Sequence, residues 1–181
     1  SYSVAEQQYC ILNSEQGLRL DGRGPLSVRP IEVQVGLVAQ ASGSARLRLG
    51  ATDVIVGVKA EVGSSHRDDP NCGRLQVAVE CSPCASPQYE GRGGESWGQL
   101  LASTLEAGLL QGPGSCSGPA ASVLRGLCII SGKAAWSLYI DALVLNDAGG
   151  VLGALSAATL CALHATRLPR VTVSQGGGEG G

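Results

Sequence analysis

Basic residues and cysteines are the side chains of this 181-residue chain whose types and spacing first suggest chemistry. Eleven of the thirteen basic residues are arginine, and the planar guanidinium group suits bidentate contacts with phosphate or carboxylate. A high genomic GC content would give the same excess of arginine, alanine and glycine. The composition therefore permits a phosphate-handling function without establishing one.

Arg46 and Arg48 form the first candidate cluster, because they alternate with Leu47 and would lie on one face of a strand, with Lys59 nearby. Such a cluster could line a channel or an interface between subunits. A solvated sheet face is the commoner explanation for alternating charges. Both interpretations remain open at the level of sequence.

Neither the cysteines nor the aspartates form a metal-binding pattern, and we expect no metal and no cofactor. Cys81-Ser-Pro-Cys84 has the spacing of a ligand pair, but it lacks a second pair or a nearby histidine. Buried free thiols in a reducing compartment are the favoured interpretation of the seven cysteines. Asp141 and Asp147 are expected at opposite ends of a strand and turn, where local hydrogen bonds suit them better than a shared ion.

The charge balance excludes one class of function. A formal net charge of −2 argues against a free-standing, strongly basic nucleic-acid binder. It does not exclude one subunit of a larger assembly, because the electrostatic field that attracts a nucleic acid is then that of the whole assembly. No signal-peptide pattern and no apolar run of membrane length occurs, so we expect an intracellular, soluble protein.

Hydrophobic periodicity predicts strands followed by a helix, a hairpin and a second helix. The residues that alternate with a period of two, and so predict strands, are 31–37, 44–49, 53–62 and 75–81. Helices are expected at 3–13, 95–110 and 151–166, the last deeply buried with Arg167 in its final turn, a hairpin at 125–145, and one more strand starting at 171–173. This order predicts an α+β fold, with a mostly antiparallel or mixed sheet packed by two helices.

The expected domain organisation has three parts. Residues 1–16 form an N-terminal helical segment, and residues 17–173 form one domain. Residues 174–181 form a Gly-rich tail that should be disordered.

Several motifs together resemble the RNase PH family in their order and spacing over most of residues 17 to 173. They are Asp21-Gly-Arg-Gly24, 42–54, 57–61, Gln88-Tyr-Glu-Gly-Arg-Gly-Gly94, 136–145, Gly149-Gly150 and Thr166-Arg-Leu-Pro169. The arginine motif and the Thr166–Pro169 ending are most similar to a non-catalytic ring subunit of the eukaryotic RNA exosome. The resemblance implies the left-handed β-α-β domain of that family.

The resemblance also implies an assembly. Family members are phosphorolytic 3′-to-5′ exoribonucleases, or inactive relatives, that form six-membered rings around an RNA channel. The implied partners are other RNase PH-like exosome subunits in a hetero-hexamer, cap subunits, and RNA in the channel, with no membrane. The implied locations are the nucleus, the nucleolus and the cytoplasm.

In active members a Thr-Arg pair follows the Gly-Gly and binds phosphate, because two anions approach each other only where cationic donors hold them. Here Gly149-Gly150 is followed by Val151-Leu152, which we expect to be core residues of a degenerate phosphate site. No lysine or arginine occurs from Ala134 to Thr166. The metal-binding carboxylates of the family lie in the part of the fold beyond these residues, so we expect this chain to be the first half of a subunit.

Arg92 matches an arginine that contacts the RNA backbone in active relatives. It fits equally well as a loop arginine paired with Glu90 or Glu95. The leading hypothesis is a structural, non-enzymatic ring subunit that supports 3′-to-5′ RNA processing and degradation. The alternatives are a phosphate-dependent 3′-to-5′ exoribonuclease, and a shortened chain that does not assemble stably.

Overall fold

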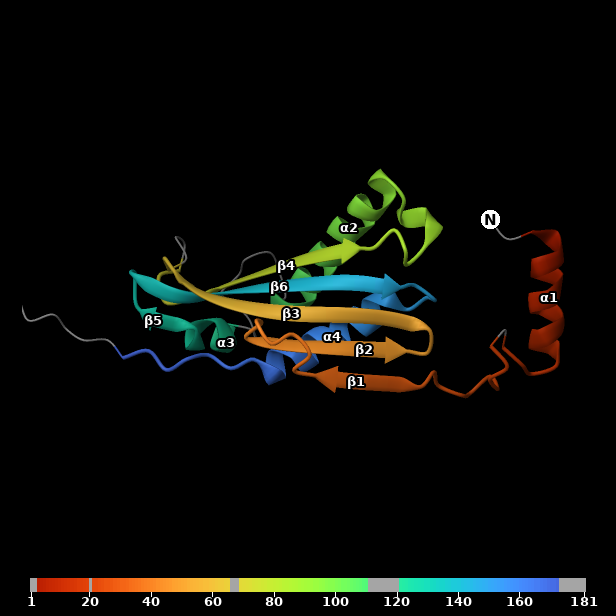
Figure 1. The fold of residues 1–181 in the computed structure, drawn as a ribbon, viewed down its shortest axis with the longest axis horizontal. Coiled ribbons are helices and arrows are strands. Elements are labelled where there is room, and N and C mark those ends of the chain that lie inside the picture. The colour runs from red at the N-terminus through yellow and green to blue at the C-terminus, as the bar shows by residue number, and fades with distance from the viewer. Residues whose placement is uncertain (1–2, 20, 66–68, 111–120, 173–181) are drawn as a thin grey trace, which may run out of the picture. The chain divides into compact units, whose positions relative to one another are not determined.

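The computed structural model describes residues 3–19, 21–65, 69–110 and 121–172 (Figure 1). The chain divides into two compact units, Ser1–Pro30 and Ile31–Gly181. The expected tail at 174–181, together with Val173 and Cys116, lies outside the described residues.

The first unit contains one helix, α1 (Val4–Glu15), where a helix was expected at 3–13. A capping box begins it: the Ser3 hydroxyl accepts a hydrogen bond from the Glu6 N–H, and the Glu6 carboxylate accepts one from the Ser3 N–H. The hydrogen bond from the Ser3 backbone lowers the pKa of Glu6. The segment that follows has no regular structure where it is described, as its glycines and prolines predicted.

The second unit is built on a six-stranded mixed sheet with the order β1-β2-β3-β6-β4 and a short β5 beside β6. Among the strands of the described residues, the pairing of β4 with β6 is the one parallel pairing. The strands are β1 (Ile31–Val35), β2 (Gly43–Leu49), β3 (Thr52–Gly63), β4 (Arg74–Cys81), β5 (Cys128–Ile130) and β6 (Ala134–Asn146). The prediction of an α+β fold with a mixed sheet is confirmed, and β4, α2 (Arg92–Leu110) and β6 form the expected β-α-β unit.

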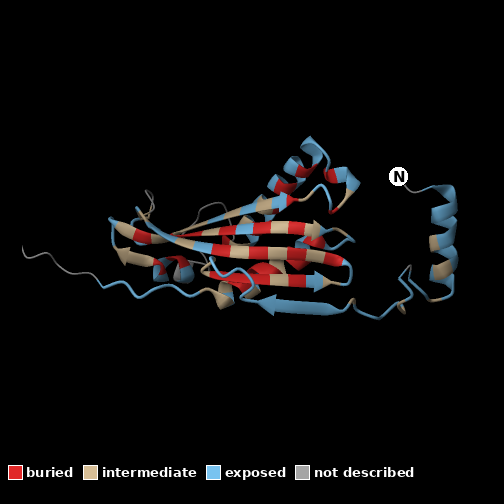
Figure 2. Cartoon of the chain, in the orientation of Figure 1, coloured by how far each residue is buried: buried red, intermediate tan, exposed pale blue. Residues whose placement is uncertain are grey.

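One face of the sheet forms the core. Val54, Val56 and Val58 of β3 are completely buried, and they lie opposite Val144, Ala142 and Ile140 of β6. Helix α4 (Val151–Ala165) packs on β2 and β3, and α2 packs on β4. Figure 2 shows the resulting alternation of buried and more exposed residues along the central strands. The two predicted helices therefore cover the apolar face and leave the other face open.

Glycines bring α2 unusually close to β4. A Cβ atom at Gly98 would lie 2.4 Å from the Val79 carbonyl oxygen, and one at Gly94 would lie 2.7 Å from the Tyr89 carbonyl oxygen. Real Cβ atoms do not make contacts this short with backbone atoms, so only glycine fits. This close approach places the N-terminal end of α2, with Arg92, beside the end of β4.

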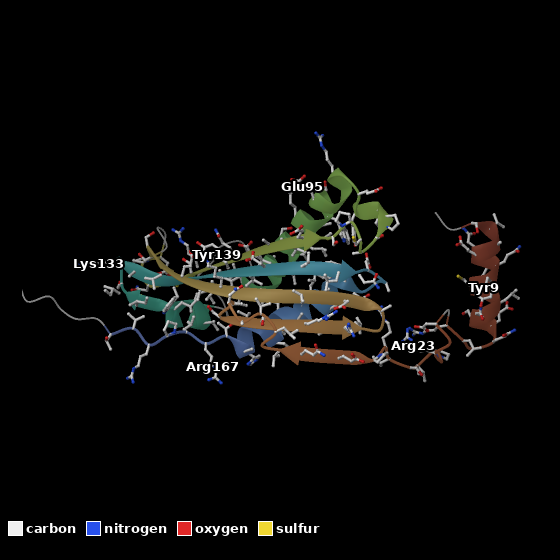
Figure 3. All side chains as sticks on the ribbon, viewed as in Figure 1. Tyr9, Arg23, Glu95, Lys133, Tyr139 and Arg167 are labelled. Carbon is white, nitrogen blue, oxygen red and sulfur yellow. The ribbon has the colours of Figure 1, made fainter. Side chains whose placement is uncertain are left out.

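Four local predictions are wrong. Helix α2 begins at Arg92 rather than at Glu95, and the first arm of the hairpin is reduced to β5, because Arg125 belongs to a short helix, α3 (Ala121–Gly126). Helix α4 is not buried all round, since Leu160 is 53% exposed. Arg167 lies beyond the end of α4, on an extended segment (Figure 3).

The predicted strand at 171–173 is also absent from the described residues, where Val171 and Thr172 form no regular structure. Pro169 precedes this segment and cannot donate to a strand ladder. Before Pro169, the chain is held next to the start of β2 by a hydrogen bond from the Arg167 N–H to the Ser42 carbonyl oxygen at 3.0 Å.

The close contact between α2 and β4 leads to a stability prediction. Gly98→Ala should lower the free energy of unfolding by about 1–3 kcal/mol, because the new methyl group meets a backbone oxygen. Gly108→Ala is the matched control in the same helix, where a Cβ atom meets nothing within 4 Å. That variant should gain about 0.5–1 kcal/mol from helix propensity. Urea unfolding measures both, and equal effects would contradict the proposed packing.

Candidate functional site

The loop that joins β6 to α4 is the first part of the candidate site. Gly149 and Gly150 adopt positive φ angles of 88° and 74°, a conformation that glycine reaches without strain. The Thr52 hydroxyl donates to the Gly149 carbonyl at 2.8 Å and accepts from the Ala148 N–H at 3.1 Å. Asp147 accepts from the Gly149 N–H at 2.9 Å. The loop is therefore held by a fully buried threonine that the sequence analysis did not identify.

Helix α4 starts directly after this loop, with Gly150 as its N-cap residue. Val151 is buried, in agreement with the prediction. Leu152 is 40% exposed, so the expectation that both residues belong to the core is wrong for Leu152. A helix N-terminus favours anions through its free N–H groups and dipole. In the loop and first turn, however, the one charged side chain is the Asp147 carboxylate, which repels an anion.

A partly buried hydrogen bond connects this loop to the segment before α2. The Tyr89 hydroxyl, on the short 3-10 helix η1 (Pro87–Tyr89), donates to the Asp147 carboxylate. The Asp147 N–H donates to the Ala85 carbonyl at 3.3 Å. Burial, followed by the hydrogen bond to Asp147, raises the pKa of Tyr89. Asp147 is thus a turn residue, as expected, but with a structural partner from a motif 58 residues away.

The same contact forms one wall of a pocket of about 240 Å³, lined by Gln88, Tyr89, Gly93, Trp97 and Asp147. The arginine motif and the glycine loop are therefore brought to the same end of the sheet. Their only ionised group at this pocket is a carboxylate that already accepts two hydrogen bonds. This carboxylate would repel a phosphate at the pocket.

Arg92 is exposed at the first position of α2, next to the pocket residue Gly93. In the described part of the chain it forms no ion pair with Glu90 or Glu95, so the interpretation as a paired loop arginine is wrong. The helix begins three residues earlier than predicted, because Gly93 and Gly94 fit closely against the backbone of residues 88 and 89. Arg92 is therefore a cation directed to solvent beside the candidate site.

Arg46 and Arg48 do share one face of β2, as predicted, and both bind Asp53 of β3. Arg46 donates to both Asp53 carboxylate oxygens, at 2.9 and 2.6 Å, and Arg48 donates to one of them at 3.2 Å. The hydrogen bond from Arg46 is the main cause that lowers the pKa of Asp53, and it also raises the pKa of Arg46. The Arg46 N–H donors that could bind a phosphate in a bidentate manner are therefore already bound to the Asp53 carboxylate.

Lys59 does not join this cluster. Lys59 lies on the same face of the sheet as Arg46. Arg46 pairs with Ile55, and Lys59 is four residues further along β3, a separation of about 13 Å. Its ammonium group pairs with Glu61 at 2.6 Å, and that hydrogen bond raises the pKa of Lys59. Asp141 is exposed on the neighbouring strand, close enough to raise the pKa of Lys59 as well.

Within the described residues, no three histidine, cysteine or acidic side chains gather as metal ligands would. The six described cysteines are free thiols, of which Cys72 and Cys81 are buried and Cys84 is exposed. Burial raises the pKa of Cys81. Of the described helices, none combines the length and apolar character that a membrane crossing requires.

The fold and the glycine loop define an α+β domain with a mixed sheet covered on one face by two helices. The chain belongs to the RNase PH family, because the family described as "3′ exoribonuclease family, domain 1" matches residues 27–169. The resemblance inferred from the motifs is thereby confirmed.

Several relatives carry the name exosome complex component Rrp42. The protein of Pyrococcus abyssi is 34% identical over 165 residues, covering 91% of this chain and 58% of that protein. The protein of Sulfurisphaera tokodaii is 38% identical over 164 residues, covering 90% and 57%.

A solved structure titled "archaeoglobus fulgidus exosome with RNA bound to the active site" aligns with a TM-score of 0.77 and 29% identity. It covers 91% of this chain and 62% of that chain. The chain therefore spans less than two thirds of the length of these relatives.

The Asp53 cluster leads to a prediction about pH. Because the folded pKa of Asp53 lies below its ordinary value of 3.8, its stabilisation is complete above that value and is lost as the pH falls through the folded pKa. Asp53→Asn should cost about 1–2 kcal/mol at neutral pH, and less below pH 3.8. Urea unfolding across this range checks it. Asp141→Asn is the exposed control, and a constant difference at all pH values would contradict the assignment.

The bond between Tyr89 and Asp147 leads to a second prediction. Tyr89→Phe should lower the free energy of unfolding by about 1 kcal/mol, because the partly buried Asp147 carboxylate loses a hydrogen-bond donor. Tyr9→Phe, at an exposed position of α1, should change stability by less than about 0.5 kcal/mol. Thermal unfolding compares the two variants. If both substitutions had the same small effect, the Tyr89 bond would not hold the site together.

Proposed function

We propose that this chain is part of a non-catalytic subunit of an exosome-type ring, in which it shapes the RNA channel and supports 3′-to-5′ RNA processing and degradation. Its membership of the RNase PH family and the exosome names of its relatives support the ring assignment. The single observation that supports the absence of catalysis is the start of α4, where Val151 and Leu152 follow the glycine loop.

Phosphorolysis requires an inorganic phosphate to approach a phosphodiester, and each carries negative charge. Positioned cations overcome that repulsion and stabilise the charge of the transition state. At the glycine loop of this chain the side chains offer no cation, and the Asp147 carboxylate adds to the repulsion. Backbone N–H groups at the helix start remain, but without a guanidinium they form a weak anion site.

Contact with RNA is proposed for Arg92 rather than for the arginines of the sheet. Arg46 and Arg48 are held by Asp53, and Lys59 is held by Glu61, so an RNA phosphate would have to compete with a protein carboxylate. Arg92 has no such competitor among the described residues and stands beside the pocket. A surface arginine of this kind would contact the RNA backbone without reading its sequence.

The proposed partners are other RNase PH-like subunits in a hetero-hexamer, together with cap subunits and the RNA that passes through the channel. The proposed setting is an intracellular RNA-processing complex, in the nucleus, the nucleolus and the cytoplasm. Within the chain, residues 17–173 are proposed to form the ring domain, with 1–16 as a separate helical segment.

The test of this proposal measures phosphate-dependent release of labelled nucleoside diphosphates from an RNA that is labelled uniformly in its backbone phosphates. The chain alone should release none, and a ring assembled with a related subunit should release them only when that partner retains its own phosphate-binding arginine. Phosphate-dependent release by the chain alone would favour the exoribonuclease alternative. Failure to co-purify with any ring subunit would instead contradict the structural function.

A charge reversal tests the contact of Arg92 with RNA. Arg92→Glu should weaken ultraviolet cross-linking of RNA to this chain within the assembled ring by several-fold, which corresponds to roughly 1 kcal/mol. The acidic residue suits the first turn of a helix, so folding should be unaffected. Arg125→Glu changes an exposed arginine on α3 and is the matched control. If both variants lost the same amount of RNA cross-linking, the change in net charge would explain the effect, and a specific contact of Arg92 with RNA would be contradicted.

A further inference from the structure

Strand β1 is an open edge of the sheet with an apolar face. All five of its residues are exposed, as Figure 2 shows, and Ile31, Val33 and Val35 are 60%, 44% and 59% exposed. These three side chains lie on the side of the sheet that is covered by α4, because they pair with Leu49, Leu47 and Ala45. Natural proteins usually shield such an edge, since it is a template for another strand.

The register shows which backbone groups of β1 are free to bind. The Gly36 N–H donates to the Ser44 carbonyl at 2.9 Å, and hydrogen-bonded pairs recur at every second residue of an antiparallel ladder. Glu32 and Gln34 therefore direct their backbone groups to β2. The N–H and C=O groups of Ile31, Val33 and Val35 point away from the sheet, three donors and three acceptors along one edge.

We infer that β1 pairs with β1 of a second copy of this chain, antiparallel and centred on Val33. In this arrangement Val33 faces Val33 of the other copy, and Ile31 faces Val35. All three residues with outward backbone groups then meet their counterparts, so the edges are complementary along the whole strand. The inference does not depend on the proposed function.

The charges of the β1 side chains favour the same register, the one centred on Val33. Centred on Val33, the pairing places each Glu32 carboxylate opposite a Gln34 amide, which can donate to it. A shift by two residues in one direction would place Glu32 opposite Glu32, and like charges directly opposite are unfavourable. A shift in the other direction would place Glu32 opposite Gly36, which lies beyond the end of β1 and has a φ angle of 75°. Glu32 is available for this contact, because Arg48, its neighbour in β2, binds Asp53 instead.

The symmetry also completes the apolar face. The two-fold axis of such a pair is perpendicular to the sheet, so both α4 helices lie on the same side, and the six β-branched side chains fill the space between them. Helix α4 already contacts β1 within one chain. The strand pair alone is smaller than the roughly 1,200 Å² of a typical stable interface, so we expect a weak dimer.

Sedimentation velocity of the full 181-residue chain, from roughly 5 µM to 1 mM, tests the inference. The wild type should shift from the mass of 18.3 kDa toward twice that mass. Val33→Pro removes an outward donor without touching the β2 ladder, so it should remain monomeric. A wild type that stays at 18.3 kDa, or a Val33→Pro variant that still dimerises, would overturn the inference.

Two changes at Gln34 test the register even if the proline variant folds poorly. Gln34→Lys should tighten the dimer roughly 2- to 30-fold, because two new pairs with Glu32 form. Gln34→Glu should weaken it by a similar factor, because two like-charge pairs form. In the monomer Gln34 lies opposite Arg46, so the same changes should affect unfolding in the opposite direction. Equal dimerisation of the two variants would refute this register.

Discussion

The antiparallel pairing of β3 with β6 is the constraint on which the rest of the domain depends. Strand β2 joins the sheet through β3, and β4 and β5 join it through β6. A register shift of one residue would turn the buried valines of β3 toward solvent, so the hydrophobic effect holds this pairing firmly. The same pairing brings Thr52, at the start of β3, to the loop after β6. The site geometry is therefore a consequence of core packing.

Charge in this domain is balanced over short distances. On the open face of the sheet, Arg46, Arg48 and Lys59 form ion pairs with carboxylates of the same or the neighbouring strand. At the glycine loop, the Asp147 carboxylate accepts a hydrogen bond from the buried Tyr89 hydroxyl. Such internal compensation leaves little field to draw a polyanion from solution. In the proposed ring, such a chain would contribute through its shape and through contacts with neighbouring subunits more than through its own charge.

The sequence was sufficient to predict β2, β3, β4 and β6 and the presence of the two long helices, because most of these elements bury one apolar face and so show a regular hydrophobic period. The sequence was insufficient where contacts between distant residues determine the start of a helix or the partner of a side chain. The sequence predicted a helix from Glu95, yet Gly93 and Gly94 lie in the first turn of α2, where only glycine fits against the η1 backbone. Asp53 looked like one charged residue in an alternating strand, and only the register shows that it holds two arginines. The bond between Tyr89 and Asp147 has no local signal, since the two residues belong to separate motifs.

The hydrogen bonds of Thr52 also bear on the order of folding. They join residues about a hundred positions apart, whereas β1, β2 and β3 connect through short turns. Closing a long loop costs more chain entropy and slows the step that depends on it. We therefore expect the three N-terminal strands to form first and the glycine loop to become ordered last, together with β6. A nascent chain would then present its open β1 edge well before its candidate site exists.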